Sequence, residues 1–382
     1  MFAYGMIAVV LAIYLEQIGL SKSDIGLLFS LTMMGDTAIS LLLTTRADRF
    51  GRRKTLMIGA LLMFGASLVF ALTSSFLLLL IAATIGVLSP SGNEVGPFLP
   101  IEQAALSEEL TSEKRVAVIA WYNLTGYFAT AVGALVGGIG SQSLQHSGWS
   151  QLDSFRAIIA AHGLIGVAML VLYSRMTRAS ETSHVASTEV LWLGLHKSKG
   201  TVLKLSGLFS IDAFAGGFVM QSLIAYWFHL RWGATEGQLG SLLFFGNLFA
   251  GVSSLMAVKL AKRFGLVNTM VWTHIPSNVL LILVPIMPRF ELAIGVLLLR
   301  FCLSQMDVPT RQAYVMAVVD PNERSAAGGV TGIARSVGTS LAPLFTGAAF
   351  AVPVLGLPFL IAGGLKIGYD LALWKVARGT NL

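Results

Sequence analysis

Charged side chains inside long apolar stretches are the residues of this sequence that could do chemistry. On insertion scales a charge at mid-bilayer costs about 2.5–3.5 kcal/mol, so such a residue usually lines a cavity. A carboxylate in an apolar site can bind and release a proton, which makes proton coupling the first hypothesis for the acidic members. The charged residues of this kind are Asp36, Glu94, Glu102, Asp212, Asp307, Arg300, Arg311 and Arg335.

Two interpretations are open for most of these charges. Asp212 lies among small residues that allow close helix packing, where it would carry protons, but at a helix end it would cap the helix or pair with Lys204. Asp36 and Glu94 have the same two interpretations. For Glu94 the functional one is favoured, because the neighbouring Pro90 predicts unwound backbone, which is tolerated at membrane depth mainly beside a cavity.

Asp307 and Arg311 are four residues apart, which places them on one helical face and predicts an intrahelical ion pair. Anchoring of a substrate is the alternative.

Polar and aromatic residues in the apolar stretches predict the lining of a binding path. Aromatic walls with a few amides suit a moderately hydrophobic small molecule, although each residue alone is also compatible with helix packing. The set is Trp121, Tyr122, Asn123, Gln221, Tyr226, Asn247, His274, Asn278 and Gln305.

Other kinds of chemistry find little support in the sequence. No two His are spaced as metal ligands, and hydrolase, metalloprotease and nucleotide-binding motifs are absent. Cys302 is the single cysteine and cannot form an intrachain disulfide. We therefore expect no metal, no cofactor and no enzymatic activity.

Composition predicts the elements that position these residues. Of the 382 residues, 55% are hydrophobic and 12% are charged, against about 25% charged in a soluble domain. The apolar runs are long and do not alternate, which favours helices over a barrel. The net charge of +7 is scattered instead of forming a basic domain, so we expect no nucleic-acid partner. The sequence predicts an all-α integral membrane protein.

Twelve segments are long enough to span a bilayer, which takes about 20 apolar residues each. The fourth and tenth are interrupted by residues such as Pro90, Gly92, Pro100 and Pro309, which permit kinks or local unwinding. The first helix is expected to begin upstream of Met1. The segments lie near 2–18, 24–45, 55–73, 77–106, 114–140, 153–174, 203–229, 235–260, 266–286, 290–317, 322–350 and 354–376.

The two halves of the chain repeat. Ala47-Asp48-Arg49-Phe50-Gly51 matches Ala261-Lys262-Arg263-Phe264-Gly265, and Pro100-Ile101-Glu102-Gln103-Ala104 matches Pro309-Thr310-Arg311-Gln312-Ala313. Such repeats predict that six helices were duplicated to twelve, with parallel halves. The predicted domains are an N-terminal six-helix bundle (1–174), a cytoplasmic linker (175–202) and a C-terminal six-helix bundle (203–382).

Basic residues predict the orientation in the membrane. Most of the 26 Lys and Arg fall in the loops on one side, together with the linker and the C-terminus. By the positive-inside rule both termini are expected to be cytoplasmic, in a plasma (inner) membrane.

Asp48-Arg49-Phe50-Gly51-Arg52-Arg53-Lys54, placed after the second helix of a twelve-helix chain, resembles the major facilitator superfamily. The resemblance implies two six-helix bundles around a central cavity. Gly51 permits a tight turn, and Asp48 with the arginines would form charge-assisted pairs that latch the two bundles together. The alternative is that Arg49, Arg52 and Arg53 only set topology.

Two further features follow from this resemblance. Helices 4 and 10 of the fold face each other, so Glu102 and Arg311 would attract across the path, unless both are solvated at helix ends. The fifth helix is similar to the glycine-rich helix of exporters, with simple packing as the alternative. Its glycines are Gly126, Gly133, Gly137, Gly138 and Gly140.

We expect a secondary transporter that works by alternating access. Export of a drug-like or metabolic compound coupled to protons is the first hypothesis, and uptake of a small solute by proton symport is the second. A hypothesis of another class is a membrane sensor, an anchor or a lipid scramblase. The expected partners are a small-molecule substrate, protons and the lipid bilayer, and the protein is expected to be a monomer.

Overall fold

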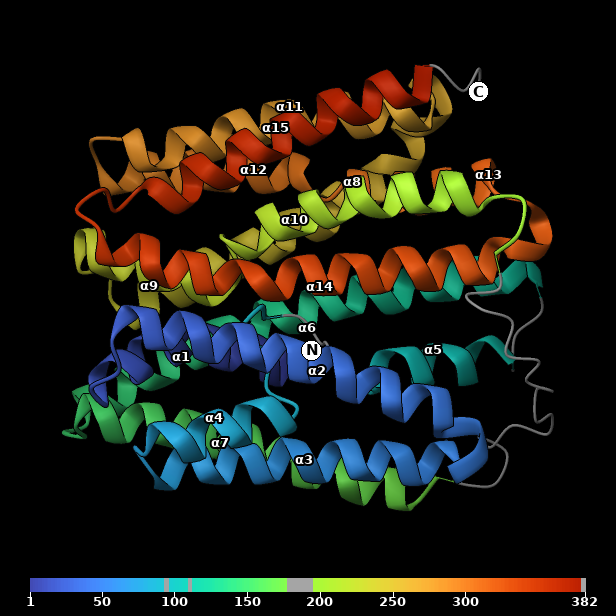
Figure 1. Cartoon of the computed structure of the whole chain (residues 1–382). Helices are drawn as coiled ribbons and strands as arrows, with labels where there is room; N and C mark the ends of the chain where they lie inside the picture. The colour runs from blue at the N-terminus through green and yellow to red at the C-terminus, as the bar shows by residue number, and fades with distance from the viewer. Residues whose placement is uncertain (93–95, 109–111, 177–194, 379–382) are drawn as a thin grey trace. The chain divides into compact units, whose positions relative to one another are not determined.

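The computed structural model describes residues 1–92, 96–108, 112–176 and 195–378. Throughout these ranges the regular secondary structure is helical, and α1 to α15 account for all twelve predicted spans (Figure 1). Nine helical segments of the described residues are long and apolar enough to cross a membrane. The predicted all-α membrane fold is confirmed. Glu94 and most of the linker at 175–202 lie outside the described residues.

The helices form two compact units, which we describe separately. Unit 1 contains residues 1–187 and 220–244, and unit 2 contains 188–219 and 245–382. The helices of unit 1 are α1 (Phe2–Gln17), α2 (Lys22–Phe50), α3 (Arg52–Leu72), α4 (Phe76–Ile85), α5 (Phe98–Glu108), α6 (Ser112–His146), α7 (Gln151–Ser174), α9 (Gln221–Trp232) and the start of α10 (Glu236–Phe264). Those of unit 2 are α8 (Lys199–Gly217), the rest of α10, α11 (Leu266–Leu283), η3 (Val284–Ile286), α12 (Phe290–Ser304), α13 (Asp307–Val318), η4 (Pro321–Glu323), α14 (Arg324–Ala351) and α15 (Leu357–Arg378). The domain boundaries drawn from the sequence stay a prediction.

Three predicted spans are broken into two helices. The fourth gives α4 and α5, and the tenth gives α12 and α13, as the sequence predicts. Pro100 and Pro309 each occupy the third position of the second helix, where a missing N–H costs nothing. The seventh span is also broken, between α8 and α9, although it contains no proline and its sequence predicts one continuous helix.

The repeat of the two halves is visible in the backbone. Gly51 separates α2 from α3 with φ 94°, and Gly265 separates α10 from α11 with φ 83°. Both φ values lie in the left-handed region that favours glycine. Equivalent glycines therefore make the same sharp turn in each half.

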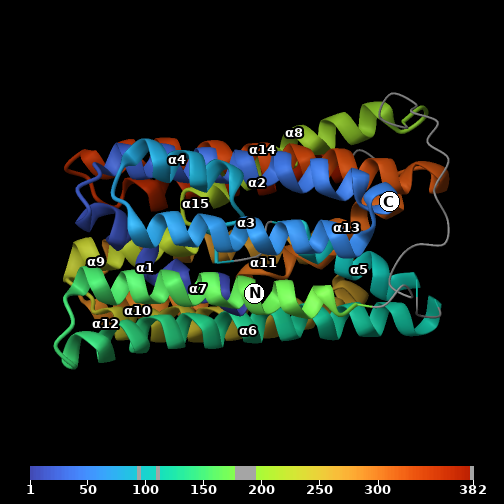
Figure 2. The ribbon, with the colours of Figure 1, turned by 90° about the horizontal axis from the view of Figure 1, so that it is seen from below.

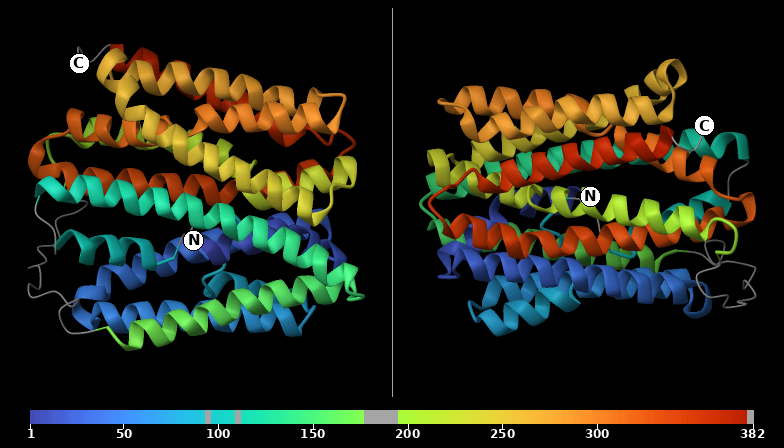
Figure 3. Two further views of the ribbon diagram at one scale, coloured as in Figure 1. Left: turned by 180° about the vertical axis from the view of Figure 1, so that it is seen from behind. Right: turned by 45° about the horizontal axis from the view of Figure 1, so that its top comes forward.

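Glycines let the helices of unit 1 approach closely. In unit 1, α3 lies beside α7 and α1 beside α6 (Figure 3). A side chain on Gly133 or Gly137 of α6 would collide with the carbonyl groups of Phe2 and Met6 in α1. Gly138 likewise packs on the backbone of Gly240 in α10. The glycine-rich face of α6 is a packing surface against two helices.

In unit 2, α8 lies along α14 (Figure 2) and α11 lies along α15 (Figure 1). Gly217 and Gly338 make the first contact close, because each packs on a backbone carbonyl of the opposite helix. An apolar core that includes Leu205, Phe209 and Tyr314 fills the space between the helices. This packing brings charged side chains from five helices together.

Candidate functional site

Asp212, in the second half of α8, is the centre of a charge cluster in unit 2. Its Oδ1 accepts a hydrogen bond from Lys366 Nζ of α15 at 2.5 Å. Its Oδ2 accepts from Arg335 Nη1 of α14 at 2.9 Å and lies 3.4 Å from Arg311 Nη1 of α13. Asp212 itself is 2% exposed. The carboxylate is therefore shared by three cations from three other helices, and it is not the lone carboxylate that its sequence surroundings suggested.

Arg311 also binds Asp307, one turn earlier on α13. This confirms the intrahelical pair predicted from their spacing. The break before α13 places Asp307 in the first turn of the helix, where a negative charge interacts favourably with the helix dipole. Both side chains are buried, so the pair belongs to the interior of the unit.

Asp370 extends the cluster by one turn of α15. Its carboxylate contacts His274 Nδ1 at 2.8 Å and accepts a hydrogen bond from Asn278 Nδ2 at 3.1 Å. Asp370 also interacts electrostatically with the charges of Asp212 and Lys366. Sequence reasoning did not single out Asp370 or Lys366 as candidates, although both lie inside the predicted span 354–376 and could have been found by that signal.

Arg300 of α12 is a buried cation beside the same cluster. It is 8% exposed, and its guanidinium lies 5.3 Å from the ring centroid of Phe301. The charges of Asp307 and Asp212 act on it. Its Nε has no hydrogen-bond partner among the residues that the structure describes.

A cavity of about 540 Å³ opens beside the cluster within unit 2. Two of the clustered cations, Arg311 and Arg335, form part of its wall, and Arg311 lies over the ring of Phe209 at 5.7 Å. The residues that line it are Phe209, Pro309, Arg311, Gln312, Ala313, Val315, Met316, Gly328, Thr331, Gly332 and Arg335.

Asp36 in α2 is the buried carboxylate of unit 1. It is 1% exposed, and neither oxygen has a hydrogen-bond partner among the described residues. Gly35 packs on the carbonyl of Thr84 in α4, and Ser40, one turn after Asp36, donates to the carbonyl of Gly96 at 3.3 Å. This part of α2 therefore contacts α4 and the broken segment between α4 and α5.

The broken segment also contacts the start of α9. Ser222 N–H donates to the carbonyl of Pro90 at 3.2 Å, and Gly92 packs on the side chain of Gln221. Irregular backbone at membrane depth is tolerated where it is buried in protein or lines a cavity. Of the predicted lining residues, Gln221 is placed at this break, and Tyr226 is buried on the same helix.

Glu102 in α5 is held by two tyrosines of unit 1. Its carboxylate accepts hydrogen bonds from Tyr122 of α6 and from Tyr173 Oη of α7, the second at 2.6 Å. In the repeat, Glu102 is equivalent to Arg311, whose partners lie in unit 2. Each residue is thus partnered inside its own unit, and an attraction between them stays a prediction.

Comparison with known proteins gives the family. The model of the Major Facilitator Superfamily matches residues 1–343. The chain belongs to this superfamily. Accordingly, it is an integral membrane transporter and not an enzyme.

Relatives and solved structures agree with this assignment. The chain is 29% identical over 412 residues to the uncharacterized membrane protein YJR124C of Saccharomyces cerevisiae, covering 100% of this chain and 92% of the relative. It is 22% identical over 368 residues to the quinolone resistance protein NorA of Staphylococcus aureus, covering 95% and 90%. Its fold is similar to that of the xylose transporter XylE from E. coli, with a TM-score of 0.71 at 15% identity over 98% and 94% of the chains.

The loop that carried the family resemblance is described in part. Arg53 Nη2 donates to the carbonyl of Ser174 at the end of α7, at 2.5 Å, and Arg52 is buried. This contact satisfies one of the free carbonyls at a helix C-terminus. The side chains of Asp48 and Arg49 lie outside what the structure describes, so the latch stays a prediction.

The remaining predicted lining residues are dispersed. Trp121 is 69% exposed, and Asn123 accepts a hydrogen bond from Gln103 at 3.2 Å. In unit 2, Asn247 is buried in α10, and the backbone N–H of Gln305 donates to Ser253 Oγ at 3.3 Å. Asn278 is the one member of the predicted amide set whose side chain the described contacts place in the charge cluster.

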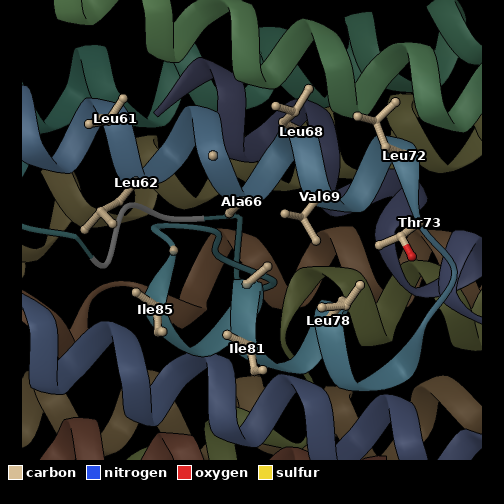
Figure 4. A pocket seen from close by; sticks show the side chains of 13 residues that line it. Leu61, Leu62, Ala66, Leu68, Val69, Leu72, Thr73, Leu78, Ile81 and Ile85 are labelled. Carbon is tan, nitrogen blue, oxygen red and sulfur yellow. The ribbon is translucent and has the colours of Figure 1, made fainter.

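A second cavity, of about 550 Å³, lies between α3 and α4 of unit 1 (Figure 4). Leu62 and Val69 of α3 point toward α4, which contributes Leu78, Ile81 and Ile85 to the lining. Among the described residues that line it, Thr73 carries the one polar side chain. Binding sites orient their ligands with polar groups, so the cavity with the two arginines is the better candidate.

Proposed function

We propose that this transporter is driven by protons and exports a drug-like or metabolic compound by alternating access, in a plasma (inner) membrane with both termini in the cytoplasm. The relation to NorA, a quinolone resistance protein, supports export of a drug-like compound. The basic loops support the orientation.

Asp36 is the observation that carries the proposal of proton coupling. It lies in an apolar span, is 1% exposed and has no described partner. An ionised carboxylate without a partner is very costly to bury. In this conformation Asp36 therefore holds a proton, and it can lose that proton only when a conformational change gives it water or a cation.

Such a residue couples a proton gradient to transport. When Asp36 has bound a proton it is neutral, and the transporter can adopt the conformation in which Asp36 is buried. Release of the proton on the other side of the membrane lets the site open again. One charge that moves through 100 mV provides about 2.3 kcal/mol, which is the driving force for uphill transport. Asp212 is less suited to this role, because its three cations must be displaced before it can take a proton.

Proteoliposomes with an imposed pH gradient test this proposal. The wild-type chain is expected to accumulate a compound of a chemically broad panel, with quinolones included, and to move protons when that compound is added. Asp36→Asn imitates the protonated acid, so it is expected to keep substrate exchange without a gradient and to lose gradient-driven accumulation.

Asp153→Asn is the matched control, because Asp153 is an exposed acid at the start of α7. It should accumulate substrate as the wild type does. Accumulation that persists in Asp36→Asn would remove Asp36 from the coupling step. If the wild type exchanges substrate but does not respond to the pH gradient, protons do not drive this transporter. The side on which substrate accumulates decides between export and proton symport.

A further inference from the structure

The charges of the cluster around Asp212 are not balanced. With His274 neutral, four cations meet three carboxylates, so the cluster carries one net positive charge. The contacts and the mutual electrostatic action of these groups place them in one cluster. The carboxylates Asp212, Asp307 and Asp370 and the cations Arg300, Arg311 and Lys366 are buried. The fourth cation, Arg335, is partly exposed.

Two buried hydrogen-bond donors of this region also lack partners within the described ranges. The hydroxyl group of Tyr369 and Nε of Arg300 are buried, and neither has a hydrogen-bond partner in the described part of the chain. Arg311 and Arg335 both contact the carboxylates through Nη1. A guanidinium has five N–H donors in a planar fork, so both arginines keep donors for a further acceptor.

Two of these cations line the cavity. Arg335 and Arg311 form part of its wall, and the side chain of Arg335 is 30% exposed. Arg311 lies over the ring of Phe209, and a guanidinium that stacks on a ring by its face still has its N–H groups at the edge. Apolar side chains such as Val315 and Met316 form much of the remaining wall.

We propose that this cavity binds an organic anion, a molecule with an apolar body and one carboxylate or phosphate group that Arg311 and Arg335 hold. The anion neutralises the excess charge and accepts the remaining N–H donors. A guanidinium binds such groups with two parallel hydrogen bonds. The inference rests on the proposed transport function and adds to it the chemical class of the substrate.

Three probes of one shape and different charge test the proposal. Sodium benzoate, benzamide and benzamidine share a phenyl ring and differ in the charge of the substituent. Binding to the full chain in phosphatidylcholine nanodiscs is measured by calorimetry and by the shift of the melting temperature, at one ionic strength. Benzoate is expected to bind and to raise the melting temperature, benzamide to bind at least about tenfold more weakly, and benzamidine not to bind.

Arg335→Gln is expected to weaken benzoate binding by at least about tenfold, because it removes a charge-assisted pair. Arg335→Lys keeps the charge without the fork and should lie between Arg335→Gln and the wild type. Arg289→Gln, which changes an exposed arginine before α12, is the matched control and should bind as the wild type does. The melting temperature of each variant without a probe shows whether it is folded.

Equal binding of benzoate and benzamide overturns the proposal, as does a folded Arg335→Gln that binds benzoate normally. Nanodiscs that contain phosphatidylglycerol form a separate arm. If this lipid raises the melting temperature through Arg335 while benzoate has no effect, the anion is a lipid headgroup and the proposed substrate class is wrong. Binding is measured without transport, so a failure of the anion site is distinct from a failure of the proposed proton-driven export.

Discussion

Asp36 in unit 1 and Asp212 in unit 2 both lie deep in an apolar helix, yet one has no described partner and the other contacts three cations. Their exposed fractions are nearly the same, 1% and 2%. Burial by itself therefore does not tell what an intramembrane acid does. The neighbours decide whether the group holds a proton or compensates positive charge.

This contrast supports different roles for the two units in transport. Asp36 can exist in the buried state as a neutral acid, which suits a proton carrier. Asp212 holds a network that is positively charged as a whole, which suits a site for an anion. Both assignments are proposals, and the effects of single substitutions distinguish them.

The largest expected effect comes from the same substitution at the two acids. Asp212→Asn removes the charge that three cations share, and breaking a buried ion pair by removing one partner costs about 3–5 kcal/mol. Asp36→Asn replaces a neutral acid by a neutral amide and should change the free energy of unfolding by less than about 1 kcal/mol. Denaturation of both variants in one detergent measures the difference. Equal destabilisation would contradict the contrast between the two carboxylates.

Glu102 provides an intermediate case, because neutral hydroxyl groups bind its carboxylate. Glu102→Gln should destabilise unit 1 by about 1.5 kcal/mol, the usual magnitude for a hydrogen bond to a charged group. Tyr173→Phe removes one of the donors. A double-mutant cycle of the two changes should give a coupling energy of about 0.5–3 kcal/mol. A coupling energy of zero would show that the hydrogen bond between Glu102 and Tyr173 contributes nothing to stability.

Glu323, at the end of η4 and just before α14, is expected to give the smallest effect. Burial opposes its ionisation, but hydrogen bonds from the backbone N–H groups of Ser198, Lys197 and His196 outweigh this and lower the pKa of Glu323 from 4.5 to about 2. Because the pKa of Glu323 is lower in the folded state than in the unfolded state, its ionised carboxylate stabilises the fold at pH values above the ordinary pKa. This stabilisation is lost as the pH falls from 4.5 toward 2.

Melting temperatures between pH 7 and pH 3 check this expectation. The wild type should be more stable than Glu323→Gln above about pH 4.5, and the difference should shrink below it. A difference that stays constant down to pH 3 would show that the three N–H groups do not select the ionised form.

Much of the fold could be predicted from the sequence because its signals are local. Apolar length predicts each span, Gly51 and Gly265 predict equivalent turns, and Pro100 and Pro309 predict broken helices. The pair of Asp307 and Arg311 follows from their spacing on one helix. The break between α8 and α9 has a weaker local signal, the pair Gly216-Gly217 at the end of α8. The close packing of Gly217 on α14 is a contact between distant parts of the sequence.

By itself the sequence determined that this protein is a twelve-span helical transporter of a known superfamily, and which charges lie in its spans. Hydrophobicity, turn residues and helical spacing act over a few residues, so they can be read along the chain. Only the tertiary structure decided that Asp212 contacts Arg335 and Lys366 while Asp36 has no described partner. Those partners come from helices more than a hundred residues away, and they are set by the packing of small residues that no local pattern encodes.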